Sequence, residues 1–95
     1  METKIQLSHP DGKKAIAMDK QKYTIVSEAI LKLITTKGAL TYSEILQGVT
    51  DEFRKNRTEF NGSLSWHLEW IKLDLEARRK IKRVELESTV KYIIV

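Results

Sequence analysis

The tightest constraint on the fold is a short segment that separates two helical patterns. Gly38 suits the end of a helix, because glycine tolerates the left-handed backbone that closes many helices. Thr41 and Glu44 have the spacing of a capping box, in which each side chain satisfies a free backbone amide of a new helix. Ala39 and Leu40 leave room only for a short extended link. The sequence therefore predicts two helices joined by a tight turn.

Apolar residues recur at helical spacing over three stretches of the chain. The pattern predicts helices over residues 20–37, 42–54 and 62–79. Asp19 is a suitable cap for the first helix, and either Asn61 or Ser63 can cap the third. Gly48 inside the second helix costs about 1 kcal/mol relative to alanine, which indicates that another group packs closely against it.

Both ends of the chain have strand character. Residues 81–95 are rich in β-branched and aromatic side chains, which predicts a terminal hairpin. Its expected turn at Ser88 and Thr89 has no glycine or asparagine, so a two-residue primed turn is not expected. Residues 1–18, with a turn at 9–12, are expected to form an N-terminal arm or hairpin.

The order of helix, link, helix, helix and hairpin is the plan of a winged helix-turn-helix. We therefore expect one α+β domain over residues 1–95, made of an N-terminal arm or hairpin (1–18), a three-helix core (19–80) and a C-terminal β-hairpin wing (81–95). The chain has no cysteine, which excludes disulfides and thiolate metal sites. No apolar stretch approaches the ~20 residues that span a bilayer, so we expect a cytoplasmic protein with no membrane partner.

The third helix has two apolar stripes rather than one. Leu64, Leu68, Ile71 and Leu75 form the first stripe, and Trp66, Trp70, Leu73 and Ala77 form the second, about 200° around the helix. A surface helix of a monomer needs only one such stripe. Three hypotheses account for the second stripe. The N-terminal arm or the wing covers it, it forms a homodimer interface centred on its tryptophans, or it holds a stacked base or a ligand.

The charge balance permits a nucleic-acid partner. The chain has 17 Lys and Arg against 13 Asp and Glu, a net charge of +4. The candidate phosphate contacts are Arg54, Lys55, Arg57, Lys72, Arg79, Lys82 and Arg83. Asp74–Arg78 and Glu76–Lys80 are expected ion pairs one helical turn apart. Because Glu69 repels phosphate and the first turns of the third helix hold no arginine or lysine, non-specific contact is favoured over sequence reading.

No pattern of catalytic residues is present. Ser63, His67 and Asp74 share one side of the third helix, but His67 and Asp74 lie about 10 Å apart along its axis, too far for a hydrogen-bonded triad. The two histidines lack the spacing of paired metal ligands. We therefore expect no enzyme activity, no metal, no cofactor and no small-molecule substrate.

Several segments resemble one known family. They are His9-Pro10-Asp11-Gly12, Asp19 with Lys22-Tyr23, Leu40-Thr41-Tyr42-Ser43-Glu44, and Gly62-Ser63 followed by Trp66 and by Lys72-Leu73-Asp74-Leu75-Glu76-Ala77-Arg78. Together they resemble a small bacterial winged-helix-like family of uncharacterised proteins, over nearly the whole chain. That family usually has glycine in a left-handed cap after the last arginine, where this sequence has Arg79. The resemblance supports the fold and implies no activity.

The leading hypothesis is a module that binds double-stranded DNA or is associated with transcription, as a homodimer paired through Trp66, Trp70 and Leu73. The alternative is a protein-interaction module that binds no nucleic acid and uses the same tryptophan face.

Overall fold

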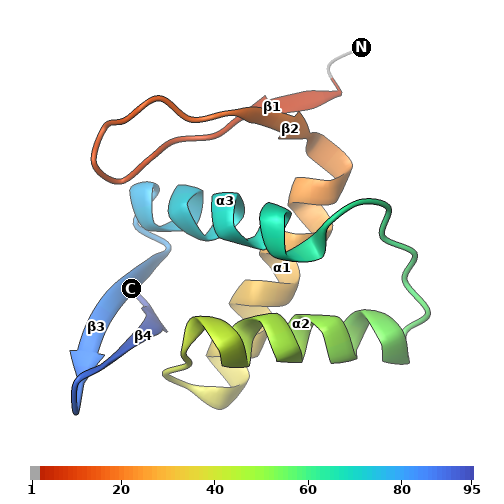
Figure 1. The fold of residues 1–95 in the computed structure, drawn as a ribbon. Coiled ribbons are helices and arrows are strands. Elements are labelled where there is room, and N and C mark those ends of the chain that lie inside the picture. The colour runs from red at the N-terminus through yellow and green to blue at the C-terminus, as the bar shows by residue number, and fades with distance from the viewer. Residues whose placement is uncertain (1–2) are drawn as a thin grey trace.

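The computed structural model describes residues 3–95, which form a small α+β fold (Figure 1). The elements in chain order are β1 (Lys4–Gln6), β2 (Ala17–Asp19), α1 (Lys20–Lys37), α2 (Tyr42–Lys55), α3 (Leu64–Ala77), β3 (Ile81–Leu86) and β4 (Thr89–Ile94). Within the described residues there are thus three helices and two antiparallel strand pairs, as expected at that level. The first two residues of the predicted N-terminal arm lie outside the described residues.

The three helices start where their capping residues predict. The Asp19 carboxylate accepts the amide of Lys22, and Thr41 and Glu44 form both hydrogen bonds of the expected capping box. Ser63 caps α3 by accepting the amide of Trp66, so this helix starts at Leu64 rather than 62, and it ends at Ala77 rather than at the predicted 79. α1 has the predicted bounds, and α2 is one residue longer than predicted. Local capping chemistry therefore sets most helix boundaries in this chain.

The core lies where α1 packs against α2, α3 and β4. Its buried apolar residues come from every part of the fold: Leu7, Met18, Val26, Ile30, Ile34, Leu40, Ile45, Val49, Phe53, Leu68, Ile71, Leu75, Ile81 and Tyr92. A Cβ atom on Gly48 would overlap a methyl group of Leu33, which confirms that α1 packs closely at this glycine. The close approach explains why α2 carries a residue that disfavours helix.

The link between α1 and α2 joins the C-terminal hairpin. Leu40 donates its amide to the Tyr92 carbonyl at 3.2 Å and accepts the Tyr92 amide at 2.7 Å. β4 therefore has β3 on one side and the Leu40 link on the other. This contact ties the hairpin to the link between α1 and α2.

The tip of the C-terminal hairpin differs from the prediction. Leu86 pairs with Thr89, so the turn is the two residues Glu87 and Ser88, with φ values of 52° and 65°. Two consecutive positive φ angles are the mark of the primed turn that was not expected, so that prediction was wrong. The hydrogen bonds of the β3–β4 ladder and the bridge of Tyr92 to Leu40 fix the register. Their stabilisation outweighs the cost of about 1–2 kcal/mol for each non-glycine residue that has a positive φ in the turn.

The N-terminal segment is a hairpin that lies against α3 (Figure 1). β1 and β2 are antiparallel, and beyond them Leu7 donates its amide to the Ile16 carbonyl at 2.9 Å. Leu7 and Met18 are buried in the core. Of the two expected forms, arm or hairpin, the described residues adopt the hairpin.

Candidate nucleic-acid interface

The two apolar stripes of α3 have different surroundings. Leu68, Ile71 and Leu75 of the first stripe are buried in the core. In the second stripe, Trp70 is half-buried and packs against the core, whereas the Trp66 side chain is 47% exposed. The chain thus covers one tryptophan of the second stripe in part and leaves the other largely at the surface.

Trp66 is held by a row of ring contacts at the start of α3. Its ring meets His67 edge to face at 4.9 Å between centroids, and His67 meets Phe60 in the same way at 4.9 Å. Phe60 in turn lies 5.9 Å from the buried Phe53 of α2. His67 Nδ1 lies 2.7 Å from the Ser63 carbonyl oxygen, which fixes the imidazole. Trp66 is therefore an exposed ring on a rigid base.

Lys72 does not lie where a phosphate could reach it. Its side chain is buried, with 6% of the residue exposed, and its ammonium donates to Glu69 and to the Tyr92 hydroxyl, each at 3.1 Å. The ammonium also lies 5.2 Å and 5.1 Å from the ring centroids of Tyr42 and Tyr92. Burial lowers the pKa of Lys72, but the bonds to Tyr92 and Glu69 outweigh it and hold the pKa above its ordinary value.

This arrangement corrects the prediction that Lys72 contacts phosphate. The helical pattern places Lys72 beside the buried stripe, one turn after Leu68, and this was the signal in the sequence that it is not a surface lysine. The pairing also offsets the charge of Glu69. The surface of α3 that carries Glu69 is therefore less repulsive to phosphate than the sequence suggested.

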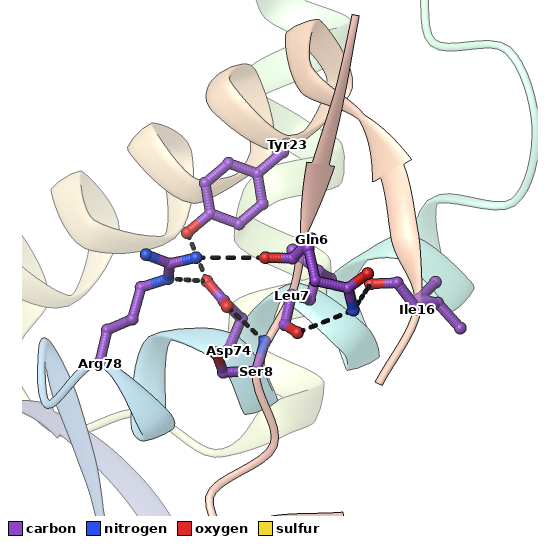
Figure 2. A network of polar contacts seen from close by, with 7 residues as sticks. All are labelled: Gln6, Leu7, Ser8, Ile16, Tyr23, Asp74 and Arg78. Carbon is purple, nitrogen blue, oxygen red and sulfur yellow. Dashed lines mark hydrogen bonds and ion pairs between the residues drawn. The ribbon is translucent and has the colours of Figure 1, made fainter. Parts of the chain in front are cut away.

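Asp74 is the buried anchor that holds the N-terminal hairpin on α3 (Figure 2). Its carboxylate accepts the Ser8 amide at 2.8 Å, the Tyr23 hydroxyl at 2.5 Å and Arg78 Nε at 2.8 Å. Arg78 also donates to the Gln6 carbonyl at 3.4 Å. The Asp74–Arg78 pair was predicted, but the contacts to Tyr23 and the hairpin were not, because they join residues far apart in the sequence.

Arg83 and Glu76 form an ion pair at the base of the C-terminal hairpin. Arg83 Nε lies 3.4 Å from Glu76 Oε1, and the guanidinium lies 5.8 Å from the Tyr92 ring centroid. Glu76 was expected to pair with Lys80, so this prediction was wrong: the hairpin turns back and brings Arg83 to the carboxylate. Arg83 is therefore only in part free for another ligand.

α2 ends in a left-handed turn at Arg57. The Arg57 amide donates to the Arg54 carbonyl at 3.2 Å, and the Thr58 amide donates to the Phe53 carbonyl at 2.8 Å. This pair of bonds is a Schellman motif, which needs a positive φ at its central residue. Arg57 adopts a φ of 54°, a conformation that glycine adopts without strain and arginine does not.

α3 ends in the same way at Arg79. The Arg79 amide donates to the Glu76 carbonyl at 3.0 Å, and the Lys80 amide donates to the Leu75 carbonyl at 2.9 Å. Arg79 has a φ of 59°, so the left-handed cap expected of a glycine forms here with an arginine. Two helices thus close on strained arginines. Backbone strain of this kind gathers at functional sites.

The remaining predicted cations form two groups, one at the end of α2 and one beyond the end of α3. All are exposed, and within residues 3–95 none takes part in an ion pair: Arg54, Lys55 and Arg57 at the end of α2, and Arg79 and Lys82 beyond the end of α3. α2 ends on the side of the molecule where α3 starts (Figure 1). With 14 residues, α3 itself is about 21 Å long.

The described residues hold neither a metal-binding cluster nor a membrane-spanning helix. No group of three or more histidine or acidic side chains within residues 3–95 is placed to hold a metal ion. None of the helices in this part of the chain is long and apolar enough to cross a membrane.

The family profile described as "Family of unknown function (DUF6958)" matches residues 4–92. The chain belongs to DUF6958. Membership confirms the expectation of a family without an assigned activity. The match includes the N-terminal hairpin, all three helices and the C-terminal hairpin as far as Tyr92. Neither the comparison with curated proteins nor the comparison with solved structures gave a match.

Proposed function

We propose that this DUF6958 member is a winged-helix domain that binds duplex DNA through the phosphate backbone. The order of elements supports the fold, because the Leu40 link between α1 and α2 lies beside β4, and β4 lies beside β3, as the strands of a winged helix do. The third helix of that plan is the one that enters the major groove. In this chain that helix is α3.

The observation that carries the proposal is the pair of exposed cationic groups, one at the end of α2 on the side where α3 starts and one beyond the end of α3. The major groove is about 12 Å wide and α3 is about 21 Å long, so an α3 that crosses the groove extends to both bordering phosphate strands. The two cationic groups lie on the sides of the molecule where α3 starts and ends, so each group faces one of these strands. Arg57 and Arg79 hold these places at the cost of strained backbone. The binding role of their guanidinium groups accounts for arginine where glycine is favoured.

The exposed face of α3 supports binding without sequence reading. It carries Trp66 and the half-buried Leu73, and its Glu69 carboxylate is already paired with Lys72. Base edges in the major groove are read by arginine, lysine, asparagine and glutamine, which this face does not offer within residues 64–77 except for the buried Lys72. Affinity then comes from phosphate contacts, which are independent of sequence.

The test is anisotropy of a labelled mixed-sequence duplex at low salt. One variant replaces Arg54, Lys55 and Arg57 with glutamine, and a second replaces Arg79 and Lys82. The matched control replaces Lys13 and Lys14, two exposed lysines of the N-terminal hairpin. Both test variants should weaken binding, and the slope of log K against log salt should fall by about 0.9 for each phosphate that is no longer neutralised. An equal weakening in the control shows a net-charge effect and contradicts the assigned interface.

A second candidate function follows from the exposure of Trp66. A protein-interaction module without nucleic-acid binding would use Trp66 and Leu73, because tryptophan is enriched at the centres of interfaces. Trp70 is half-buried and packs against the core, so Trp66→Ala alone tests this function with less effect on the fold than a double change. A Trp66→Ala protein that keeps its mass in solution and its duplex affinity contradicts the second candidate.

A further inference from the structure

β3 has one edge that no described residue pairs with. β4 lies between β3 and the Leu40 link, whereas β3 is paired with β4 alone among residues 3–95. Figure 1 shows β3 at the outer side of the hairpin, away from the helices that pack on its base. An open edge of six residues offers backbone donors and acceptors to another strand.

The register shows which groups lie along this edge. Val95 donates its amide to the Lys80 carbonyl at 3.2 Å, so this pair belongs to the hydrogen-bonded set of the ladder. Hydrogen-bonded and non-hydrogen-bonded pairs alternate along an antiparallel ladder. The amides and carbonyls of Ile81, Arg83 and Glu85 therefore point away from β4, toward the open edge.

The charges along the edge are complementary to themselves. An antiparallel pair of β3 strands centred on Val84 places Arg83 opposite Glu85 of the second copy, and Glu85 opposite Arg83 of the second copy. If the pair is centred on Arg83 instead, Arg83 lies opposite Arg83 of the second copy, and if it is centred on Glu85, Glu85 lies opposite Glu85 of the second copy. Opposite charges across a strand pair stabilise it by roughly 0.2–1 kcal/mol, and like charges destabilise it. The charges therefore favour the register centred on Val84.

The same register covers apolar surface on the other face of the hairpin. Val84 is half-buried and Leu86 is 47% exposed in the single chain. Pairing centred on Val84 brings the two Val84 side chains together and places Leu86 opposite the aliphatic part of Lys82 of the second copy. Burial of these groups adds to the backbone bonds of the edge.

We propose that two copies of this chain associate through their β3 edges, centred on Val84, and form a continuous sheet in the order β4, β3, β3, β4. The interface is short, below the ~1,200 Å² typical of stable complexes, so the association is weak and depends on concentration. It does not depend on DNA binding, and it differs from a dimer built on the tryptophans of α3.

The experiment is sedimentation equilibrium of the full chain over a range of concentrations, without nucleic acid. Glu85→Pro removes an amide that points to the open edge and leaves the bonds between β3 and β4, so it should abolish the dimer. Glu85→Lys places like charges opposite each other at two symmetric positions and should raise the dissociation constant at least about tenfold. Glu59→Lys, at an exposed position in the loop between α2 and α3, is the matched control and should leave the dissociation constant unchanged. Circular dichroism reports whether each variant is folded.

The decisive measurement is whether a second substitution that restores charge complementarity also restores the dimer. Arg83→Glu combined with Glu85→Lys should recover the dimer that Glu85→Lys alone loses. Glu76→Gln is included in the proteins compared, because the Glu76 carboxylate pairs with Arg83 within the chain and would repel a glutamate at that position. The inference is overturned if the wild-type chain is monomeric at all concentrations, or if Glu85→Pro associates as strongly as wild type. It is also overturned if Trp66→Ala dissociates the dimer while Glu85→Lys does not, since the interface then lies on α3.

Discussion

Arg79→Gly should stabilise this fold although it removes a large side chain. Arg79 has a φ of 59° in the cap of α3. The left-handed conformation costs a residue with a Cβ about 1–2 kcal/mol, and glycine avoids that cost. Glycine also gives the unfolded chain more freedom, which costs about 0.5–1 kcal/mol. The net gain in the free energy of unfolding is therefore about 0.5–1 kcal/mol, which corresponds to a rise in Tm of about 2–8 °C for a domain of this size.

Thermal unfolding by circular dichroism measures this gain, with Arg79→Ala as the control. Alanine keeps the Cβ and thus the strain, so its Tm should remain close to that of wild type. The reasoning is refuted if glycine and alanine give the same Tm, because relief of strain in the cap then contributes nothing. The same two variants should lose equal duplex affinity, since both lack the guanidinium group. Arg79→Gly should thus be more stable than wild type and bind more weakly.

Three further predictions concern buried groups. Asp74→Asn should lower the free energy of unfolding by about 2–4 kcal/mol, because a side-chain amide cannot accept hydrogen bonds from Ser8, Tyr23 and Arg78 together. A decrease below about 1 kcal/mol, measured by urea titration, contradicts the anchor role. Burial, with the hydrogen bond to Asp74, raises the pKa of Tyr23 well above its ordinary value. The contribution of the protonated Tyr23 hydroxyl to the free energy of unfolding is therefore fully present below the unfolded pKa near 10 and is lost as pH rises beyond it. Urea titrations from about pH 9 to 11 should show that the free energy of unfolding declines less steeply for Tyr23→Phe than for wild type. Lys72→Met should lower the free energy of unfolding by about 1–2 kcal/mol, because the Tyr92 hydroxyl loses its hydrogen-bond donor. It should leave duplex affinity within about twofold of wild type. A tenfold decrease in the affinity of the folded variant would instead show that Lys72 contacts phosphate.

The bounds of α1 and the start of α2 were predicted correctly because their causes are local, whereas α3 is two residues shorter at each end than predicted. The carboxylate of Asp19 and the hydroxyls of Thr41 and Ser63 bond to amides within the next turn, so the residues that fix each start are adjacent in the sequence. The close contact at Gly48 was predictable for a similar reason, since a helix interior tolerates glycine at a cost that packing explains.

The surroundings of Lys72 and Asp74 depend on residues that are distant in the sequence. Lys72 meets Tyr92 of β4, and Asp74 meets Tyr23 of α1 and the Ser8 amide of the N-terminal hairpin. No spacing rule connects these residues. The prediction of the C-terminal hairpin turn was wrong because it used local residue preferences alone. Glutamate at position 87 disfavours the observed turn, but the register of the whole β3–β4 ladder determines it. Tertiary pairing thus overrides local preference at these places.

The most direct test of the central claim is the salt dependence of binding between the wild-type chain and a mixed-sequence duplex. The proposed contacts are Arg54, Lys55, Arg57, Arg79 and Lys82. If each of these cations neutralises one phosphate, log K should fall against log salt with a slope of about −4 to −5. Absence of binding at low salt, or binding with a slope near zero, would contradict the account and leave the surfaces of Trp66 and β3 as the functional parts of the molecule.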